Sequence, residues 1–356
     1  MPTHTLHFIK PCRKTDSSPR LTPSMVAENK RNGIETTLIL DLNILVRMED
    51  VILRRHSPND FDLTRLINFI NSCPPQSLCI TPGLALNEVH PKFKKLSFEM
   101  YELFLSIFCP QMIDHPTATR NTPNETERTR PYEFSELSIE EQHLYSVPFF
   151  SLMQIHIINA TKPSLPSIEK FKTYMSRVCD DIDMLSAVEA EIAKYCFCEK
   201  KPNYSDELNA KIEDIKNNFM SGSNKPAQRF KNIFNGVQDL KYIKGALEFS
   251  KELFYGKLQD TWIATLDSKL YWLSESIHHY PVAGERDGKY FSINRSHDQQ
   301  TCNYWLSVDK LQEQLQHERS RNGKGTAPLD ETGLPRIHNT LTTKSFKEFF
   351  AVFTPT

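Results

Sequence analysis

The 356-residue sequence is poor in glycine and carries almost no net charge. Its 11 glycines argue against a glycine-rich phosphate-binding loop. Gly323-Lys324-Gly325-Thr326 is not such a loop, because the upstream glycine and the preceding strand are both missing. The net charge of -1 gives no global attraction to nucleic acid, so any basic surface has to be local.

The eight cysteines lack the spacing of a disulfide framework or a zinc site. Cys196-Phe-Cys198 has no second pair of Cys or His nearby, so reduced, mostly buried thiols are favoured over a metal site. The chain has no apolar stretch long enough to span a bilayer, and its N-terminus lacks the apolar core of a signal peptide. We therefore expect a soluble, cytoplasmic protein without a membrane partner. The sequence is compatible with a homo-oligomer.

The sequence does contain enough apolar side chain for a core, since 39% of its residues are hydrophobic and 24% are charged. Its length predicts one large or two modest domains. Residues 1–33 combine several prolines with six Lys or Arg and only two acids. We expect this segment to be a basic, loosely ordered arm, and its charge leaves a contact with a polyanion open.

One carboxylate interrupts a very hydrophobic run, Thr37-Leu-Ile-Leu-Asp41-Leu-Asn43-Ile-Leu-Val46. Such a run predicts a strand buried on both faces, as in a parallel sheet. A charge at that place is costly unless it is paired or binds a metal. Asp41 is therefore either a structural acid paired with a lysine or the first ligand of a cation site.

The segments after Asp41 alternate as in a parallel α/β domain. A helix at 61–70, a strand at 76–81 and a turn into a helix at 82–89 follow one another. The α/β pattern resumes at 230, with a helix at 237–254, a strand at 261–267 and a helix from 268. Between these parts the chain is all-helical, with helices expected at 92–109, 136–160, 167–198 and 205–221 and a polar stretch at 114–133.

The predicted fold class is thus α/β, a parallel-sheet domain with a large all-helical insertion. Its parts are an arm at 1–33, an α/β domain at 34–100 and 230–300, a helical insertion at 101–229 and a C-terminal extension at 301–356. The extension ends in an aromatic-rich segment at 346–353. A free tail rarely carries four phenylalanines, so we expect the extension to dock on the domain.

Four acids follow or approach the predicted strands. Ligands of open parallel sheets gather at the carboxyl ends of the strands, and there four acids would repel one another without a cation. Hard oxygen ligands suit Mg²⁺ or Mn²⁺. Taken singly, each acid also has a structural explanation, as a helix acid or a helix cap. The four are Asp41, Glu88, Asp239 and Asp267.

These motifs together resemble the PIN-domain ribonucleases. Leu40-Asp41-Leu-Asn43 is similar to the opening strand motif of that family, and Thr81-Pro-Gly-Leu-Ala-Leu-Asn-Glu88 is similar to its helix carrying a Glu. Asp239 resembles the third acidic position, and Thr265-Leu-Asp267 resembles the closing strand. The matched segments cover less than half of the chain. The insertion departs from compact members and leaves Asp180, Asp181 and Asp183 as rivals of Asp239, which we favour.

The resemblance implies a three-layer PIN-like domain and a Mg²⁺- or Mn²⁺-dependent endoribonuclease that hydrolyses RNA with metal-activated water. It implies that the four acids hold the metal and that Asn43 and Thr265 orient them. Three lysines shortly after Glu88 either contact RNA phosphates or lie on a solvated helix face; they are Lys92, Lys94 and Lys95.

Other functions remain open at this stage. A large elaborated nuclease is compatible with a toxin or defence effector, which would imply a regulatory protein partner or antitoxin. A catalytically silent PIN-like scaffold acting through protein contacts is the alternative of a different class. A structure-specific DNase on a related fold is the third.

Overall fold

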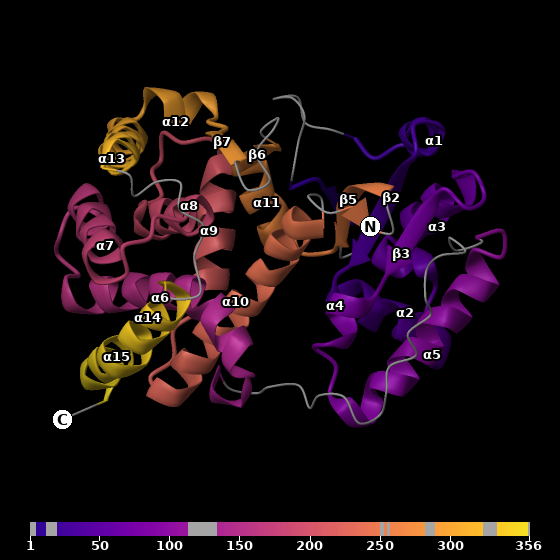
Figure 1. Cartoon of the computed structure of the whole chain (residues 1–356), viewed down its shortest axis with the longest axis horizontal. Helices are drawn as coiled ribbons and strands as arrows, with labels where there is room; N and C mark the ends of the chain where they lie inside the picture. Colours follow the sequence, from indigo (N-terminus) through magenta and orange to yellow (C-terminus); the bar gives the residue numbers. More distant parts are fainter. Residues whose placement is uncertain are drawn as a thin grey trace. The chain divides into compact units, whose positions relative to one another are not determined.

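The computed structural model describes residues 5–11, 20–112, 134–249, 253–254, 257–281, 289–322 and 333–354 (Figure 1). The chain forms two compact units. The first, which we call the α/β unit, contains residues 1–130 and 241–286, and the second, the helical unit, contains 131–240 and 287–356. The predicted polar stretch at 114–133 and the segment 323–326 lie outside the described residues.

The sheet of the α/β unit is built around strand β2 (Ile34–Leu40). Parallel neighbours flank it on both sides, β3 (Leu78–Thr81) and β5 (Lys257–Thr265). Two short strands, β1 (His7–Ile9) and β4 (Leu253–Phe254), pair antiparallel with β5. The predicted α/β class is confirmed, but the sheet is mixed and mostly parallel where the sequence predicted a parallel one.

The described part of the N-terminal segment is more regular than the loosely ordered arm expected from its composition. It supplies β1 and helix α1 (Pro23–Arg31), which packs on β2. Thr22 caps α1, and Pro23 takes the first turn, where a missing N–H costs nothing. Lys10 is tied to the sheet by an ion pair of 2.5 Å with Asp260.

The first strand ends earlier than its hydrophobic run predicted. Strand β2 stops at Leu40, and Leu42 already opens helix α2 (Leu42–Arg54), so Asp41 lies at the junction and not inside a strand. Buried Ile44, Leu45 and Met48 follow the helical period. A short apolar run is compatible with a buried strand or a buried helix, which is why the prediction extended the strand too far.

Helices complete the α/β unit. Helices α2 and α5 pack against each other, and α4 contacts β2. Helix α10 (Pro226–Phe249) crosses the division between the units, which falls between Leu240 and Lys241. The remaining elements are η1 (Pro58–Phe61), α3 (Leu63–Ser72), α4 (Gly83–Leu86), α5 (Pro91–Phe108), α11 (Ser268–Ser276) and β6 (Ile277–Pro281).

The helical unit is organised around α6 (Ile139–Thr161). A continuous buried stretch from Ser146 to Ile158 runs through this helix, as expected for a helix enclosed by others. Helices α7, α8, α14 and α15 pack on it. The remaining elements are η2 (Phe134–Glu136), α7 (Ser167–Asp181), α8 (Ala187–Phe197), α9 (Asp206–Phe219), β7 (Lys289–Ile293), α12 (His297–Thr301), α13 (Asn303–Arg321), α14 (Gly333–Thr340), the π-helical η3 (Leu341–Ser345) and α15 (Phe346–Phe353).

Two predictions about this unit need correction. The single helix expected at 167–198 is two helices, because Asp183 adopts a left-handed backbone conformation with a φ of 49°. The aromatic C-terminal segment does dock, but on the helical unit: Phe346 packs edge-on against Phe149 at 5.6 Å between ring centres.

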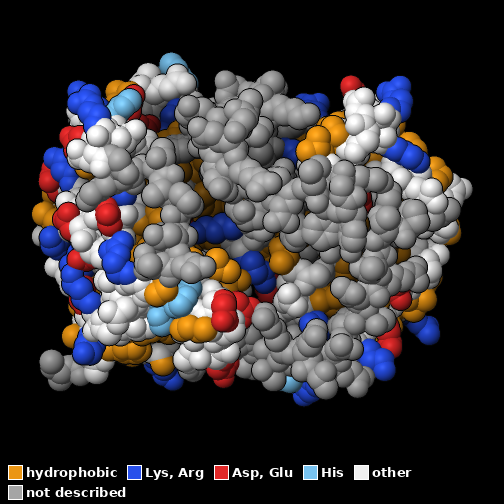
Figure 2. All heavy atoms as spheres, viewed as in Figure 1, with side chains coloured by type: hydrophobic (Ala, Val, Ile, Leu, Met, Phe, Trp, Pro, Cys, Tyr) orange, Lys and Arg blue, Asp and Glu red, His pale blue; other side chains and the backbone are white. Residues whose placement is uncertain are grey.

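Acidic and basic side chains intermingle on the face of the helical unit visible in Figure 2. Within the described ranges, no helix combines the length and apolar character needed to cross a membrane.

Candidate functional site

Strands β2 and β5 end side by side and place Asp41 at their carboxyl edge. The register sets Leu40 opposite Ala264, and the Asp41 N–H donates to the Ala264 carbonyl at 3.0 Å. Thr265 is the last residue of β5. The carboxyl edge of a parallel pair is where open α/β sheets bind ligands, so Asp41 lies where a site is expected.

Two polar side chains hold the Asp41 carboxylate in place. The Thr265 hydroxyl donates to Asp41 Oδ2 at 2.5 Å, and Asn43 Nδ2 donates to the same oxygen at 2.6 Å. Asn43 is fixed in turn, because its Oδ1 accepts the Leu266 N–H at 3.0 Å. Asn43 and Thr265 thus contact Asp41 in the way expected of residues that orient a ligand carboxylate.

Glu88 follows the four-residue helix α4 and does not lie on a helix as predicted. It is only 8% exposed, and its Oε1 lies 3.0 Å from Lys241 Nζ. The Tyr242 hydroxyl accepts the Leu42 N–H at 3.2 Å, and the nearby Glu88 carboxylate contributes to the raised pKa of this tyrosine. In the described part of the chain, the buried Glu88 Oε1 has the Lys241 ion pair but no hydrogen bond of acceptable geometry. A buried oxygen left in this state has spare capacity for a cation.

Asp267 caps helix α11, as the sequence predicted. Its Oδ1 accepts the Lys269 N–H at 2.8 Å, and its own N–H donates to Thr265 Oγ1 at 2.9 Å. Thr265 therefore joins two of the predicted acids, since its hydroxyl donates to Asp41 and accepts from the backbone of Asp267. One side-chain oxygen fixes the geometry of both.

The charges of the three acids act on one another. The pKa of Asp41 is raised to about 6, mainly by burial; the Thr265 hydrogen bond opposes the shift, and the Glu88 and Asp267 carboxylates contribute to it. Within the described residues, the ion pairs of these acids include one cation, Lys241. The site therefore holds an excess of negative charge at a buried position.

The other predicted acids lie in the helical unit. Asp239 Oδ2 accepts a hydrogen bond of 3.1 Å from Asn218. Of its rivals, Asp181 pairs with Lys344, and Asp183 pairs with Arg319 at 2.7 Å. Searched over the described ranges, the structure contains no group of three or more His, Cys, Asp or Glu side chains arranged to hold a metal ion. The described residues thus do not form a closed metal site made of protein ligands alone.

The three candidate lysines lie in the first turns of α5, just after Glu88. Lys92 and Lys95 are exposed, and Lys94 Nζ donates to Asn87 Oδ1 at 3.3 Å. His90 caps the helix by accepting the Lys92 N–H at 3.3 Å. This placement is compatible with phosphate contacts and equally with a solvated helix face.

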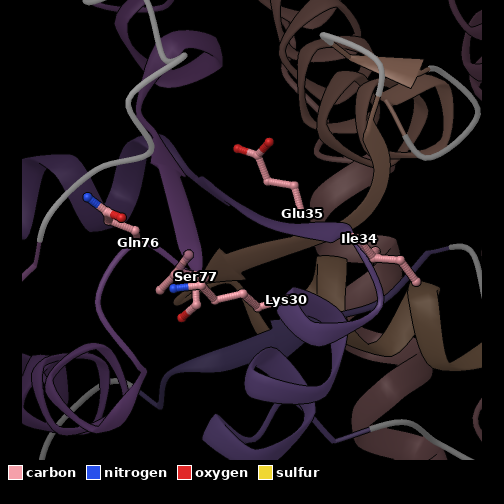
Figure 3. A pocket seen from close by; sticks show the side chains of 7 residues that line it. Lys30, Ile34, Glu35, Gln76 and Ser77 are labelled. Atoms are coloured by element: carbon pink, nitrogen blue, oxygen red, sulfur yellow. The ribbon is translucent and has the colours of Figure 1, made fainter.

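A cavity of about 180 Å³ opens at the amino ends of strands β2 and β3, at the opposite edge of the sheet from Asp41 (Figure 3). Lys30, Glu35 and Ser77 contribute to its lining, near the first residues of β2 and β3. Sheets of this kind bind ligands at the carboxyl ends and not at the amino ends of their strands. We therefore assign the candidate site to the acids and not to this cavity.

Lys241 and Tyr242 were not predicted from the sequence. Both lie on α10 shortly after Asp239; Lys241 pairs with Glu88, and Tyr242 lies near it. The signal that could have revealed them is electrostatic: a buried acidic site requires a compensating cation, and Lys241 is the basic residue nearest in sequence to Asp239.

Comparison of the chain with protein-family models, with curated proteins and with solved structures gives no match. The findings establish an α/β fold with a mostly parallel mixed sheet and many helices. The PIN-like interpretation rests on the motifs and on the geometry of Asp41, Glu88 and Asp267.

Proposed function

We propose that the protein is a Mg²⁺- or Mn²⁺-dependent endoribonuclease of PIN-like type, with Asp41 as the central metal ligand. The observation that carries the proposal is the position of Asp41 at the carboxyl edge of β2 and β5, where the Thr265 hydroxyl also binds the backbone of Asp267. Burial raises the pKa of Asp41 most, and the charges of the nearby Glu88 and Asp267 add to the rise. Perturbed acids of this kind cluster at functional sites.

The donor set fits a hard divalent cation that keeps part of its water. Mg²⁺ is usually held by one or two carboxylates, several waters and the substrate phosphates, and rarely by a dedicated protein cage. An Asp41 carboxylate fixed through one oxygen and a buried Glu88 oxygen without a hydrogen bond match this mode. Asp41 would bind the ion, and Glu88 and Asp267 would act directly or through water. The bound ion would activate water and neutralise phosphate charge.

The residues around the acids have separate tasks in this proposal. Asn43 and Thr265 fix the orientation of Asp41, which keeps its geometry constant when the ion arrives. Tyr242 binds the backbone N–H of Leu42, next to Asp41, and lies near Glu88. Lys241 balances Glu88 in the absence of a divalent ion and lies where it can turn to a phosphate oxygen.

A cleavage assay tests the proposal. Purified protein is incubated with single-stranded RNA, RNA hairpins and flapped DNA, each with Mg²⁺, with Mn²⁺ and with a chelator. We expect metal-dependent cleavage of RNA that falls by about 100-fold or more in Asp41→Asn, since the central ligand is lost. Glu99→Gln, an exposed acid on α5 of the same unit, is the matched control and should keep full activity.

Three results would contradict the proposal: every RNA staying intact, cleavage continuing in chelator, or Asp41→Asn cutting as fast as the unchanged protein. Faster cleavage of flapped DNA than of RNA hairpins would redirect it to a structure-specific DNase.

One observation favours a second candidate, a catalytically silent PIN-like scaffold. The Lys241 ammonium already compensates Glu88 at 3.0 Å, as in a structural ion pair. Titration calorimetry with Mn²⁺ separates the two. Binding that disappears in Asp41→Asn supports the nuclease, and no Asp41-dependent binding supports the scaffold, whose partners would then be proteins.

A further inference from the structure

The helical unit carries a second chemically distinctive group, a cysteine at the start of a long helix. Cys302 is the N-cap residue of α13 (Asn303–Arg321) and is half-buried. The Tyr204 hydroxyl lies 2.8 Å from its sulfur, and the Lys201 ammonium lies 3.9 Å from it. Three groups that stabilise negative charge thus meet at one thiol: a hydroxyl, a cation and a helix N-terminus.

The balance of these effects favours the thiolate. Burial acts to raise the pKa of Cys302, but the contact with the Tyr204 hydroxyl, the nearby backbone N–H groups of Tyr304 and Trp305, and Lys201 lower it overall. The thiolate is the nucleophilic form of cysteine. The half-buried Cys73 offers a contrast, because burial raises its pKa to about 12.

A second cysteine lies near the same tyrosine. Cys198 is the C-cap residue of helix α8 and is 1% exposed. Its thiol donates to the Glu199 carbonyl at 3.5 Å. Burial raises the pKa of Cys198 to about 12, and Tyr204 and Cys302 are close enough to act on this pKa as well. Two thiols with opposite pKa shifts therefore lie beside one tyrosine, although about a hundred residues of chain separate them.

We propose that Cys302 is a site of oxidation by hydroperoxides and that Cys198 is its resolving partner. The Cys302 thiolate attacks the terminal oxygen of a hydroperoxide; an S–O bond forms, the O–O bond breaks, and the leaving alkoxide or hydroxide takes a proton from solvent. Cys302 is oxidised to a sulfenic acid, and the peroxide is reduced to an alcohol or water. The Cys198 sulfur then attacks the sulfenic sulfur, and hydroxide leaves as water with the Cys198 proton.

The disulfide would fasten two helices that already meet. Tyr304 of α13 donates to the Lys194 carbonyl of α8 at 2.6 Å, and Lys194 pairs with Asp309 of α13 at 2.6 Å. Because a disulfide needs its sulfurs about 2.05 Å apart, forming it requires Cys302 to give up its 2.8 Å contact with the Tyr204 hydroxyl. The bond therefore reports on the link between α8 and α13.

Peptide mapping by mass spectrometry tests the proposal on the reduced full-length chain after exposure to hydrogen peroxide. We expect a Cys198–Cys302 disulfide, and in Cys198→Ser a sulfenic acid at Cys302 that dimedone traps. Cys302 should also react with iodoacetamide at pH 7 at least about tenfold faster than Cys73, because each unit of thiol pKa changes the thiolate fraction about tenfold. Absence of that disulfide, or equal rates at Cys302 and Cys73, overturns the proposal.

Two neighbouring lysines give a matched pair for the environment of the thiolate. Lys201→Gln and Tyr204→Phe should move the pH midpoint of Cys302 alkylation upward and slow the reaction at pH 7 several-fold. Lys200→Gln removes an exposed charge that pairs with Glu213 instead, and it should leave the pH profile unchanged. If Lys201→Gln and Tyr204→Phe both keep the original profile, these residues do not stabilise the thiolate and the assignment fails.

Discussion

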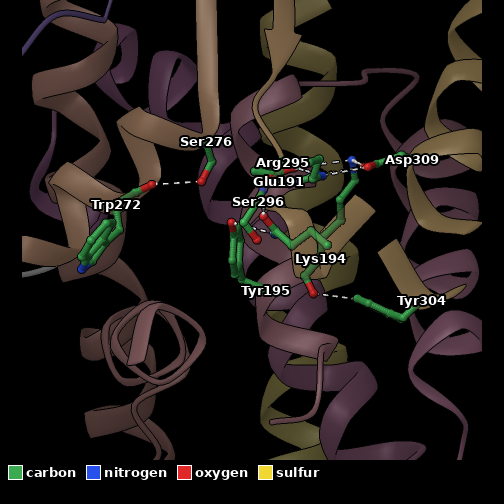
Figure 4. A network of polar contacts seen from close by, with 10 residues as sticks. Glu191, Lys194, Tyr195, Trp272, Ser276, Arg295, Ser296, Tyr304 and Asp309 are labelled. Atoms are coloured by element: carbon green, nitrogen blue, oxygen red, sulfur yellow. Dashed lines mark hydrogen bonds and ion pairs between the residues drawn. The ribbon is translucent and has the colours of Figure 1, made fainter. Parts of the chain in front are cut away.

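Each unit of this protein buries a cluster of charged side chains, and the two clusters differ in balance. The helical unit joins two acids to two bases, Glu191 and Asp309 to Lys194 and Arg295 (Figure 4). In the described part of the α/β unit, three neighbouring acids, Asp41, Glu88 and Asp267, have one base in an ion pair, Lys241 with Glu88. A neutral cluster can serve the fold alone, whereas a cluster with excess charge requires something else nearby.

The four-residue network of the helical unit is saturated with contacts. Arg295 binds Glu191 and Asp309 through paired hydrogen bonds, including contacts of 2.8 Å and 2.7 Å. Lys194 adds a bond of 2.6 Å to Asp309. Burial would lower the pKa of Arg295, but the two acids raise it well above its usual value. The pairing with Arg295 and Lys194 likewise outweighs burial and lowers the pKa of Asp309, so both Arg295 and Asp309 are stabilised in their ionised forms.

The acidic cluster shows the opposite response. The pKa of Asp41 is raised, which means that its surroundings resist the ionised form. An acid that resists ionisation adds no folding free energy to a structural ion-pair network. A divalent cation would relieve the repulsion among the three carboxylates. The contrast teaches that uncompensated buried charge, more than burial of charge itself, marks the candidate site.

The largest expected effect comes from unbalancing the helical network. Arg295→Met leaves Glu191, which is fully buried, with only Lys194 at 3.4 Å, so we expect a loss of about 3–5 kcal/mol in unfolding free energy. Urea unfolding followed by circular dichroism measures it. Lys172→Met, which breaks an exposed pair with Glu169, is the control and should cost under about 1 kcal/mol. Equal small losses in both variants would show that the network contributes no more than a surface pair.

The next effect concerns the pH dependence of the acidic cluster. Between the ordinary value of 3.8 and the folded pKa of about 6, folded Asp41 holds a proton that the unfolded chain has released. Stability contributed by this group therefore falls as pH rises through that window, by about 3 kcal/mol in total. Asp41→Asn should remove this fall and be the more stable protein at pH 7.

Urea unfolding at several pH values between 4 and 7 in the absence of divalent ions compares the two proteins. Glu99→Gln serves as the control and should keep the original slope. Parallel curves for Asp41→Asn and the unchanged chain would show that Asp41 is ionised without cost.

The carboxyl-edge position of Asp41 and Asp267 could be predicted from the sequence because Asp41 interrupts one apolar run and Asp267 ends another. Strand β1 could not, since its three residues pair with β5 about 250 positions later. The break between α7 and α8 could not be predicted either, because it contains no Gly or Pro, the residues that usually indicate a helix end. The proximity of Lys241 to Glu88 and of Cys198 to Cys302 could not be predicted, because the residues of each pair are more than a hundred positions apart in the sequence.

Manganese binding would turn the acidic cluster into a balanced one. At about 100 times the dissociation constant, Mn²⁺ should stabilise the folded chain by about 2.7 kcal/mol at pH 7 and by less at pH 5, where protons compete for Asp41. Thermal unfolding with and without Mn²⁺ measures this, and Asp41→Asn should lose the effect. A Mn²⁺-induced rise in the unfolding temperature that persists in Asp41→Asn places the metal elsewhere.

The same measurement on Asp239→Asn tests the remaining predicted ligand. Loss of the Mn²⁺-induced rise in unfolding temperature includes Asp239 in the site, and an unchanged rise excludes it.

The smallest expected effect isolates the hydroxyl that joins the acids. Thr265→Val removes the 2.5 Å bond to Asp41 and the bond from the Asp267 N–H, which should cost about 1.5 kcal/mol because hydrogen bonds to charged groups exceed neutral ones. Since that bond opposes the rise in the pKa of Asp41, its loss should also move the pH window of instability upward. Thr265→Ser keeps the hydroxyl and should restore both properties. If Thr265→Val keeps the stability and the pH window of the unchanged chain, the hydroxyl contributes nothing and Asn43 alone holds Asp41.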